Sequence, residues 1–293
     1  MSSRLRAPTA STALAVLVLV LVLVAPACTR AAPTDPSASP GTNGPGSPTA
    51  VGSPASGGEL RYMLRYDPES IDPGFVLESE GAVVVDALFD SLLAYDDDLR
   101  PVPAVAERFE VDETTTLYTF HLDPDAVFHD GSPVDAQAFV RAWSRIVDGT
   151  ADDLSPNAHH LAAVAGYEES RRDGTPLAGV EAVDAQTLRV TLQYPYADFP
   201  AVVAHPALGP VPAAAVEDTV NFREAPIGNG PFKMAGPWQH DEFIRVQRFE
   251  DHHRDVPKLD EVVFRIYRGD DAEEQAYADF EEGLVHVATV PRE

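Results

Sequence analysis

The composition of the chain changes abruptly at residue 59, and this change limits where a folded domain can lie. Residues 33–58 read PTDPSASPGTNGPGSPTAVGSPASGG, and 20 of these 26 residues are Pro, Gly, Ser or Thr. Such a segment has too few apolar side chains to offset the entropy that it would lose on ordering. We therefore expect residues 28–58 to form a flexible tether with a reach on the order of 25–30 Å, and folding to begin at Glu59.

The first 27 residues have the features of a secretory signal. Arg4 and Arg6 precede the uncharged run ALAVLVLVLVLVA, residues 13–25, which is too short to span a membrane comfortably but suits the apolar part of a signal peptide. Cys28 follows after Pro26 and Ala27 and is the only cysteine, so it cannot form an internal disulfide. The stretch resembles a bacterial lipoprotein signal, which implies cleavage after residue 27 and lipid attachment at Cys28. An ordinary signal peptide with a cysteine nearby is the alternative.

The charge balance of the chain excludes one class of partner. Lys and Arg number 21 and Asp and Glu 47, giving a net charge of −26. Nucleic-acid binding needs an excess of basic side chains, so we expect no nucleic-acid partner. A solvated acidic surface explains the charge without any ligand.

Hydrophobic periodicity predicts a mixed α/β (α+β) domain without an internal repeat. The pattern predicts a helix over residues 82–96, with Val83, Val84, Ala87, Leu88 and Leu92 facing inward. A second helix is predicted over residues 270–283, with acidic residues at its start and Gly283 at its stop. Strands are predicted over residues 59–66, 114–122, 187–193, 243–249 and 261–267.

The stretch VFHDGSPVDAQAFVRAWSRI, residues 127–146, raises the question of catalysis because it gathers His129, Asp130, Ser132 and Asp135. Asp130 to Pro133 has turn composition, and Asp135 stands at the N-cap of a helix whose apolar stripe is Phe139, Val140, Trp143, Ile146 and Val147. No nucleophile motif or regular metal-ligand spacing accompanies them, so we interpret the stretch as architecture, with no catalytic residue, metal site or cofactor. The doublets His159-His160 and His252-His253 are set aside because adjacent residues point apart on a strand or helix.

Several motifs in fixed order resemble one family of extracellular binding proteins. They are SIDPG (70–74), LFDSLLAYDDDLRPVPAVAERFEV (88–111), TLYTFHLDPDAVFHDGSPVDAQAFVRAW (116–143), GVEAVDAQTLRVTLQYPYADFPAVVAHPALGPVP (179–212) and IGNGPFKMAGPW (227–238). From Glu59 to its last residue the chain is similar to the extracellular solute-binding proteins of family 5, which serve oligopeptide, dipeptide and nickel ABC importers. The oligopeptide-binding branch is the most similar.

The resemblance implies a periplasmic-binding-protein-like fold, in which two lobes enclose the ligand. It assigns residues 59–89 and 213–293 to an incomplete first-lobe core and residues 90–212 to a subdomain inserted in it. The family builds its second lobe beyond the point that Glu293 matches, so we expect a truncated chain without that lobe and with weak peptide binding.

Candidate ligand-binding residues follow from the resemblance alone. Leu77, Glu78 and Ser79 match the extended stretch whose backbone pairs with the ligand. Asn157 stands where the family often has an aromatic residue, and His205 matches a histidine that faces the cleft. Thr289 lies where the first lobe offers polar groups, whereas Asn229 is interpreted as a structural turn residue.

The implied function is capture of an oligopeptide or similar solute for ABC permease subunits, without enzymatic activity or cofactor. The implied protein is a monomer, anchored by lipid to the outer face of the cell membrane. Two alternatives remain open: a lipoprotein adaptor or structural module that retains one lobe, and an extracellular hydrolase, for which no nucleophile or metal pattern is present.

Overall fold

The described part of the chain is residues 56–292 of a computed structural model. Its strands are β1 (Glu59–Leu64), β2 (Leu93–Tyr95), β3 (Pro101–Pro103), β4 (Ala106–Val111), β5 (Leu117–Leu122), β6 (Val180–Asp184), β7 (Thr187–Thr191), β8 (Phe232–Met234), β9 (Phe243–Arg248) and β10 (Glu261–Ile266). Its helices are α1 (Ser79–Leu88), α2 (Ala136–Val147), α3 (Tyr167–Asp173), α4 (Phe199–Val202), α5 (Ala214–Glu217), α6 (Thr219–Glu224) and α7 (Ala272–Glu281), with the 3-10 turns η1 (Ala158–Leu161) and η2 (Pro206–Leu208). Residues 1–55 lie outside the described residues. They include the predicted signal, Cys28 and all but the last three residues of the predicted tether.

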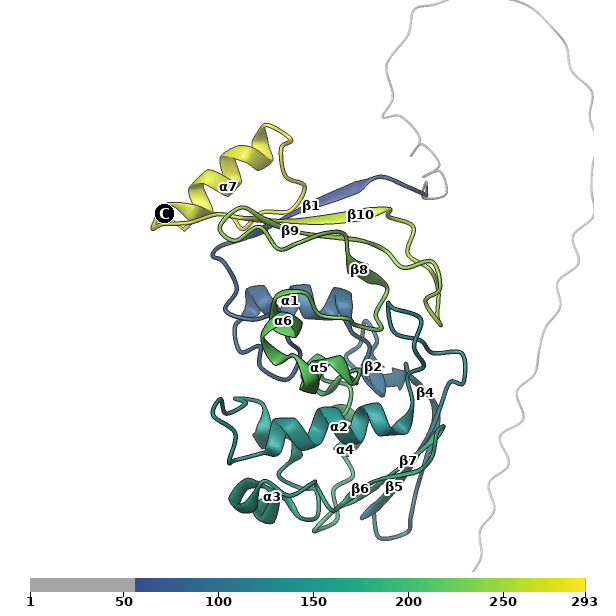
Figure 1. The fold of residues 1–293 in the computed structure, drawn as a ribbon. Coiled ribbons are helices and arrows are strands. Elements are labelled where there is room, and N and C mark those ends of the chain that lie inside the picture. Colours follow the sequence, from purple (N-terminus) through teal and green to yellow (C-terminus); the bar gives the residue numbers. More distant parts are fainter. Residues whose placement is uncertain (1–55, 293) are drawn as a thin grey trace, which may run out of the picture. The chain divides into compact units, whose positions relative to one another are not determined.

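Two four-stranded sheets organise the fold, in the orders β1-β10-β9-β8 and β4-β5-β7-β6. β1 runs parallel to β10 and the other neighbours are antiparallel. Figure 1 shows the first sheet at the top with α7 above it, the second sheet at the bottom, and α1, α5, α6 and α2 between them. The strands of the first sheet come from residues 59–89 and 213–293, and those of the second from residues 90–212.

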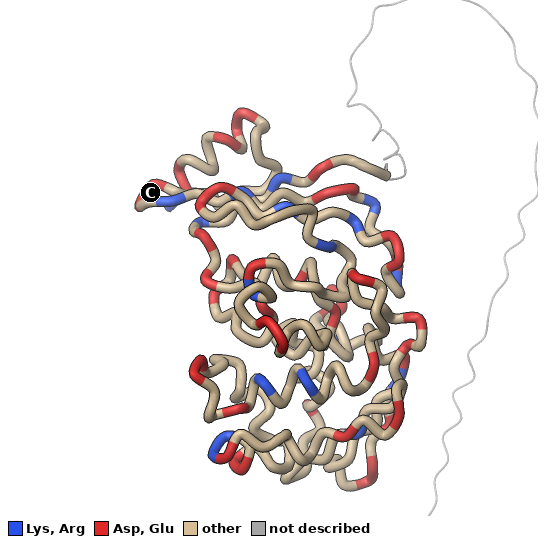
Figure 2. The backbone as a smooth tube through the Cα atoms, in the orientation of Figure 1, with Lys and Arg blue, Asp and Glu red and all other residues tan. Residues whose placement is uncertain are grey.

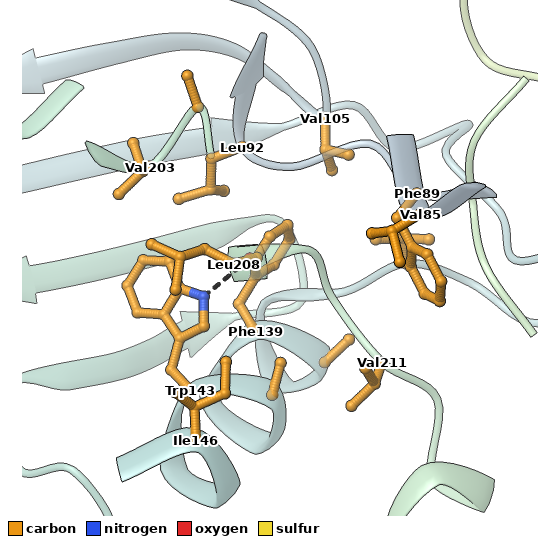
Figure 3. Packing of buried hydrophobic residues seen from close by; sticks show 14 of the residues in the cluster. Val85, Phe89, Leu92, Val105, Phe139, Trp143, Ile146, Val203, Leu208 and Val211 are labelled. Atoms are coloured by element: carbon orange, nitrogen blue, oxygen red, sulfur yellow. Dashed lines mark hydrogen bonds between the residues drawn. The ribbon is translucent and has the colours of Figure 1, made fainter. Parts of the chain in front are cut away.

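A continuous core joins the two sheets through α2. The predicted apolar stripe is buried at Phe139, Trp143, Ile146 and Val147, while Val140 packs partly buried against it. The Trp143 indole N–H donates to the Leu208 carbonyl at 2.9 Å, so this large ring is both packed and hydrogen-bonded (Figure 3). A smaller core, made of Met63, Tyr267, Ala272, Ala276 and Val285, lies under α7.

The predicted helix over residues 82–96 is wrong in its second half. α1 ends at Leu88, and Leu93–Tyr95 instead forms β2, which pairs with β3. The physical reason lies far along the chain, in the turn Gly228-Asn229-Gly230. The Gly230 N–H donates to the Leu88 carbonyl at 2.9 Å, and the Asn229 side chain bonds both backbone groups of Asp90. A Cβ at position 228 would lie 1.9 Å from the Leu88 oxygen, so this close approach requires glycine.

The other predicted elements are confirmed, with shifts at their ends. β1, β5, β7, β9, β10 and α7 all lie within the predicted ranges. α7 stops where expected because Gly283 takes φ +74° and its N–H donates to the Phe280 carbonyl.

Acidic side chains are spread over the described part of the chain. Figure 2 shows Asp and Glu in every layer, from α7 to the lower sheet, with fewer Lys and Arg among them. None of the helices in residues 56–292 is both long and apolar enough to cross a membrane.

Candidate functional site

A surface pocket of about 270 Å³ lies beside β1 and brings together two of the predicted ligand-binding residues. Ser79 reaches it from the start of α1, and Thr289 reaches it from the last described residues of the chain. We call it the β1 pocket, and its lining is Tyr62, Met63, Leu64, Arg65, Ser79, Glu80, Val83, Val287, Ala288 and Thr289.

The C-terminal wall of the β1 pocket is held in place by backbone hydrogen bonds to β1. β10 occupies one edge of β1, and residues 286–289 run along the other, with Val287 bridged in parallel to Tyr62. The Arg61 carbonyl accepts from the N–H groups of His286 and Val287 at 2.8 and 3.3 Å, and the Met63 N–H donates to the Val287 carbonyl at 3.2 Å. Thr289 is therefore placed by sheet geometry and not by a free tail.

A charged pair, made of the buried Glu80 and the exposed Arg65, lines the β1 pocket and was missed in the sequence. Glu80 is 6% exposed, and its carboxylate accepts from Arg65 Nε at 3.0 Å and from the Ser79 hydroxyl at 2.6 Å. Burial alone would raise the pKa of Glu80, but hydrogen bonds from Ser79, Tyr66 and Arg65 outweigh burial and lower it. Arg65 also contacts Glu273 of α7 at 3.1 Å. The only signal in the sequence was an acidic residue directly after the predicted extended stretch.

The predicted extended stretch ends at the β1 pocket, which Ser79 lines. Leu77 is 75% exposed and Glu78 has extended dihedral angles, φ −91° and ψ 157°, directly before α1. The Glu78 carboxylate accepts the N–H groups of Glu69 and Leu77 at 3.1 and 3.3 Å. Its side chain therefore fastens the loop, which leaves the exposed surface of Leu77 and Ser79 as the part of this stretch open to a ligand.

Asn157 lies behind this stretch. Its side chain is buried and donates to the carbonyls of Val76 and Gly74 at 2.7 and 3.3 Å. Asn157 does not line the β1 pocket; it holds the loop that leads into Leu77.

His205 occupies a structural position in η2. Its Nδ1 accepts the Ala207 N–H at 3.1 Å, which caps η2, and its ring lies 4.4 Å from that of His160. Burial lowers the pKa of His205, with the charge of His159 adding to the effect. His205 is not part of the β1 pocket either.

The turn and the helix cap that were predicted within residues 127–146 are both present. Asp130 accepts the N–H and hydroxyl of Ser132 at 2.9 and 2.6 Å, and Asp135 caps α2 by accepting the Ala138 N–H at 2.9 Å. The His129 ring lies between the Gly228 N–H and the Gly230 carbonyl, each 3.1 Å away. Burial lowers the pKa of His129 to about 4, so the ring is neutral at pH 7 and serves to clamp the turn at Asn229.

Known proteins similar to this chain bind solutes outside the cytoplasm. The sequence model for bacterial extracellular solute-binding proteins, family 5 Middle, matches residues 100–292. The chain is 39% identical over 187 residues to the periplasmic oligopeptide-binding protein OppA of Escherichia coli, covering 61% of this chain and 34% of that protein. It is 29% identical over 243 residues to the dipeptide-binding protein DppE of Bacillus subtilis, covering 81% and 44%.

The fold gives the same relationship. The Escherichia coli murein tripeptide binding protein MppA superposes with a TM-score of 0.69 at 29% identity, covering 78% of this chain and 45% of that chain. This chain thus spans less than half the length of each of these three relatives.

Proposed function

Because this chain belongs to the bacterial extracellular solute-binding proteins of family 5, we propose that it forms one side of a cleft that captures oligopeptides for an ABC importer. The observation that supports this most is the β1 pocket, where Ser79 and Thr289 converge from the two ends of the folded part. The named ligands of OppA, DppE and MppA, all peptides, support a peptide over other solutes. The proposed role is to bind the peptide without catalysing a reaction on it.

In the proposed complex, the peptide main chain lies along Leu77–Ser79 and Thr289 in the manner of an added strand. The neighbouring Glu80–Arg65 pair neutralises its own charge, at an N–O distance of 3.0 Å. The pocket therefore offers polar groups without a strong net charge, which favours recognition of main-chain amides over any particular charged side chain.

We further propose that residues 59–89 and 213–293 act as the first-lobe core and residues 90–212 as its inserted subdomain. The opposite wall of the cleft corresponds to the part of the relatives that these residues do not match. One wall leaves about half of the peptide's hydrogen-bonding groups in water, where each bond contributes only about 0.5–1.5 kcal/mol. We therefore expect the 293-residue chain to bind peptides in the millimolar range.

The test is an amide-resolved NMR titration of this chain with a pool of tri- to pentapeptides. Shift changes should concentrate at residues 62–65, 77–80 and 287–289. A Thr289→Trp variant, which fills the β1 pocket, should lose them. Thr175→Trp, which puts the same bulk into a different surface pocket beside α2, should keep them. Shifts confined to another face, or unchanged by Thr289→Trp, would contradict the proposed site.

We also propose that Cys28 carries a lipid that holds the protein, as a monomer, on the outer face of the cell membrane beside its permease. The support is the short apolar run before the chain's only cysteine. Cys28→Ala should move the protein from the membrane fraction to the soluble fraction. If the variant still sediments with membranes as the parent does, the proposal of lipid attachment is wrong, and the ordinary signal peptide is the remaining interpretation.

A further inference from the structure

A buried cluster of three metal-ligating side chains lies at the other end of α1, away from Ser79. Asp90 follows α1, and His252 and His253 come from the loop between β9 and β10. His252 Nε2 lies 2.8 Å and His253 Nε2 3.8 Å from Asp90 Oδ2. One ligand atom from each residue can be chosen so that all three lie within 4.8 Å of one another.

The convergence has a local cause that the sequence alone did not show. Neighbouring histidines point apart on a strand or a helix, but His252 and His253 lie in an irregular bend of the loop. On the other side, the Asn229 side chain bonds the N–H and carbonyl of Asp90 at 3.2 and 3.0 Å. The backbone of Asp90 is therefore held by Asn229, while its carboxylate meets both imidazoles.

A second observation, the lack of hydrogen-bond partners for buried ring nitrogens in the described part of the chain, also points to a bound ion. The side chains of His252 and His253 are 2% and 0% exposed. Among the described residues, His252 Nδ1 and both ring nitrogens of His253 are buried without a hydrogen-bond partner. Buried polar atoms are nearly always hydrogen-bonded or bound to an ion.

We propose that Asp90, His252 and His253 bind a single divalent transition-metal ion, of which Zn²⁺ is the most suitable. Two imidazole nitrogens and one carboxylate oxygen form a zinc-type donor set, whereas Ca²⁺ and Mg²⁺ require about six oxygen ligands. Ligand atoms in a tetrahedral zinc site are about 3.4 Å apart, so small side-chain rotations suffice. The ion would tie the β9–β10 loop to the end of α1, independently of any peptide.

Arg254, which contacts the Asp90 carboxylate, provides a specific test of the proposed metal site. Its Nη2 lies 3.0 Å from Asp90 Oδ1, which leaves Oδ2 for the metal, and its side chain is 37% exposed. The guanidinium repels a neighbouring cation, so Arg254→Gln should tighten Zn²⁺ binding by about tenfold. Equal or weaker binding by this variant would overturn the assignment of Asp90 as a ligand.

The experiment uses the full chain without an affinity tag, freed of metal by a chelator. Calorimetric titration with Zn²⁺ should show one ion per chain, and Co²⁺ should give the intense visible bands of a four-coordinate site. His252→Gln and His253→Gln should each weaken Zn²⁺ binding at least about a hundredfold. The matched controls are His159→Gln and His160→Gln, in a doublet that belongs to no candidate metal group among residues 56–292.

Circular dichroism and urea unfolding establish that each variant is folded, and Co²⁺ spectra of His253→Gln provide a second readout should His252→Gln not fold. The proposal is overturned if the metal-free parent binds no Zn²⁺. It is also overturned if His253→Gln binds as the parent does, or if the two control variants lose as much affinity.

Discussion

The two sheets of this protein are built from the sequence in opposite ways. The strands of β4-β5-β7-β6 come from one continuous stretch, residues 106–191, and its ladders join neighbouring hairpins. The sheet β1-β10-β9-β8 joins a strand at residue 59 to strands that begin at residue 232. The Gly58 N–H donates to an Asp260 carboxylate oxygen at 2.9 Å, and the Asp260 N–H donates to the Gly58 carbonyl at 2.9 Å.

The difference teaches where binding surfaces arise in such a chain. The continuous sheet contains two local hairpins and closes one loop, residues 123–186 between β5 and β7, whereas the discontinuous sheet must close the longer loop of residues 65–260 between β1 and β10. The β1 pocket belongs to the discontinuous sheet, since its walls are residues 62–65 and 287–289. We therefore expect the largest losses in the free energy of unfolding from substitutions at polar contacts that join the elements around one sheet to those around the other.

The largest effect is expected at the ion pair between Asp72 and Arg145. It joins the loop after β1 to α2, which packs on the continuous sheet, with N–O distances of 2.8 and 2.5 Å. Asp72 is fully buried, so Asp72→Asn leaves the Arg145 charge without its partner. We expect a loss of about 3–5 kcal/mol in the free energy of unfolding, measured with urea.

A matched control lies on the continuous sheet. Glu181 and Arg189 form an exposed pair at 3.2 Å, with side chains 60% and 41% exposed. Glu181→Gln should cost no more than about 1 kcal/mol. Equal losses of unfolding free energy for Asp72→Asn and Glu181→Gln would show that contacts between the two sheets are no more sensitive to substitution than contacts within one sheet.

Asn229→Ala should have the second largest effect. The variant leaves the Asp90 N–H and carbonyl buried without partners, at the point where α1 ends. Each unsatisfied group costs about 1–3 kcal/mol, so we expect a loss of about 2–4 kcal/mol in urea unfolding. Asn221→Ala is the control, because Asn221 is exposed and its side chain makes no hydrogen bond among the described residues. An equally large loss of unfolding free energy for Asn221→Ala would contradict the inference that the Asn229 side chain stabilises the end of α1.

The same contrast separates what the sequence could predict from what it could not. β5, β7 and α2 follow local periodicity and local caps, so their positions were predictable. The end of α1 was not, because Leu88 and Asp90 are bonded by residues 228–230, far along the chain. The β1 pocket shows both cases: Ser79 and Thr289 were predicted from family motifs, but Glu80 and Arg65 matter through contacts that no local pattern records.

The third prediction concerns pH and the His129 clamp on the discontinuous sheet. The pKa of His129 is about 4 in the folded protein and about 6.5 when unfolded, so the unfolded chain binds more protons between these values. Its contribution to the free energy of unfolding is complete above pH 6.5 and is lost as the pH falls toward 4. The full loss is about 3 kcal/mol, since one pKa unit corresponds to about 1.4 kcal/mol.

The measurement compares the parent with His129→Gln by urea unfolding between pH 4 and pH 7. The variant should be less stable at pH 7, and the difference should shrink as the pH falls. Other titrating groups act on both proteins and cancel in this comparison. A difference that stays constant over the range would mean that burial does not hold His129 neutral.

The smallest effect is expected where the continuous sheet meets its own helix. Asp135 caps α2 through one hydrogen bond to the Ala138 N–H at 2.9 Å, and the donor lies within the same local stretch. Asp135→Ala should cost about 1 kcal/mol, because it removes one part-buried cap bond while the buried stripe of α2 stays intact. Asp135→Asn retains an acceptor and should recover most of the loss in urea unfolding. A cost for Asp135→Ala as large as that of Asp72→Asn would reverse the comparison, because local bonds would then stabilise this protein as strongly as those that connect its two sheets.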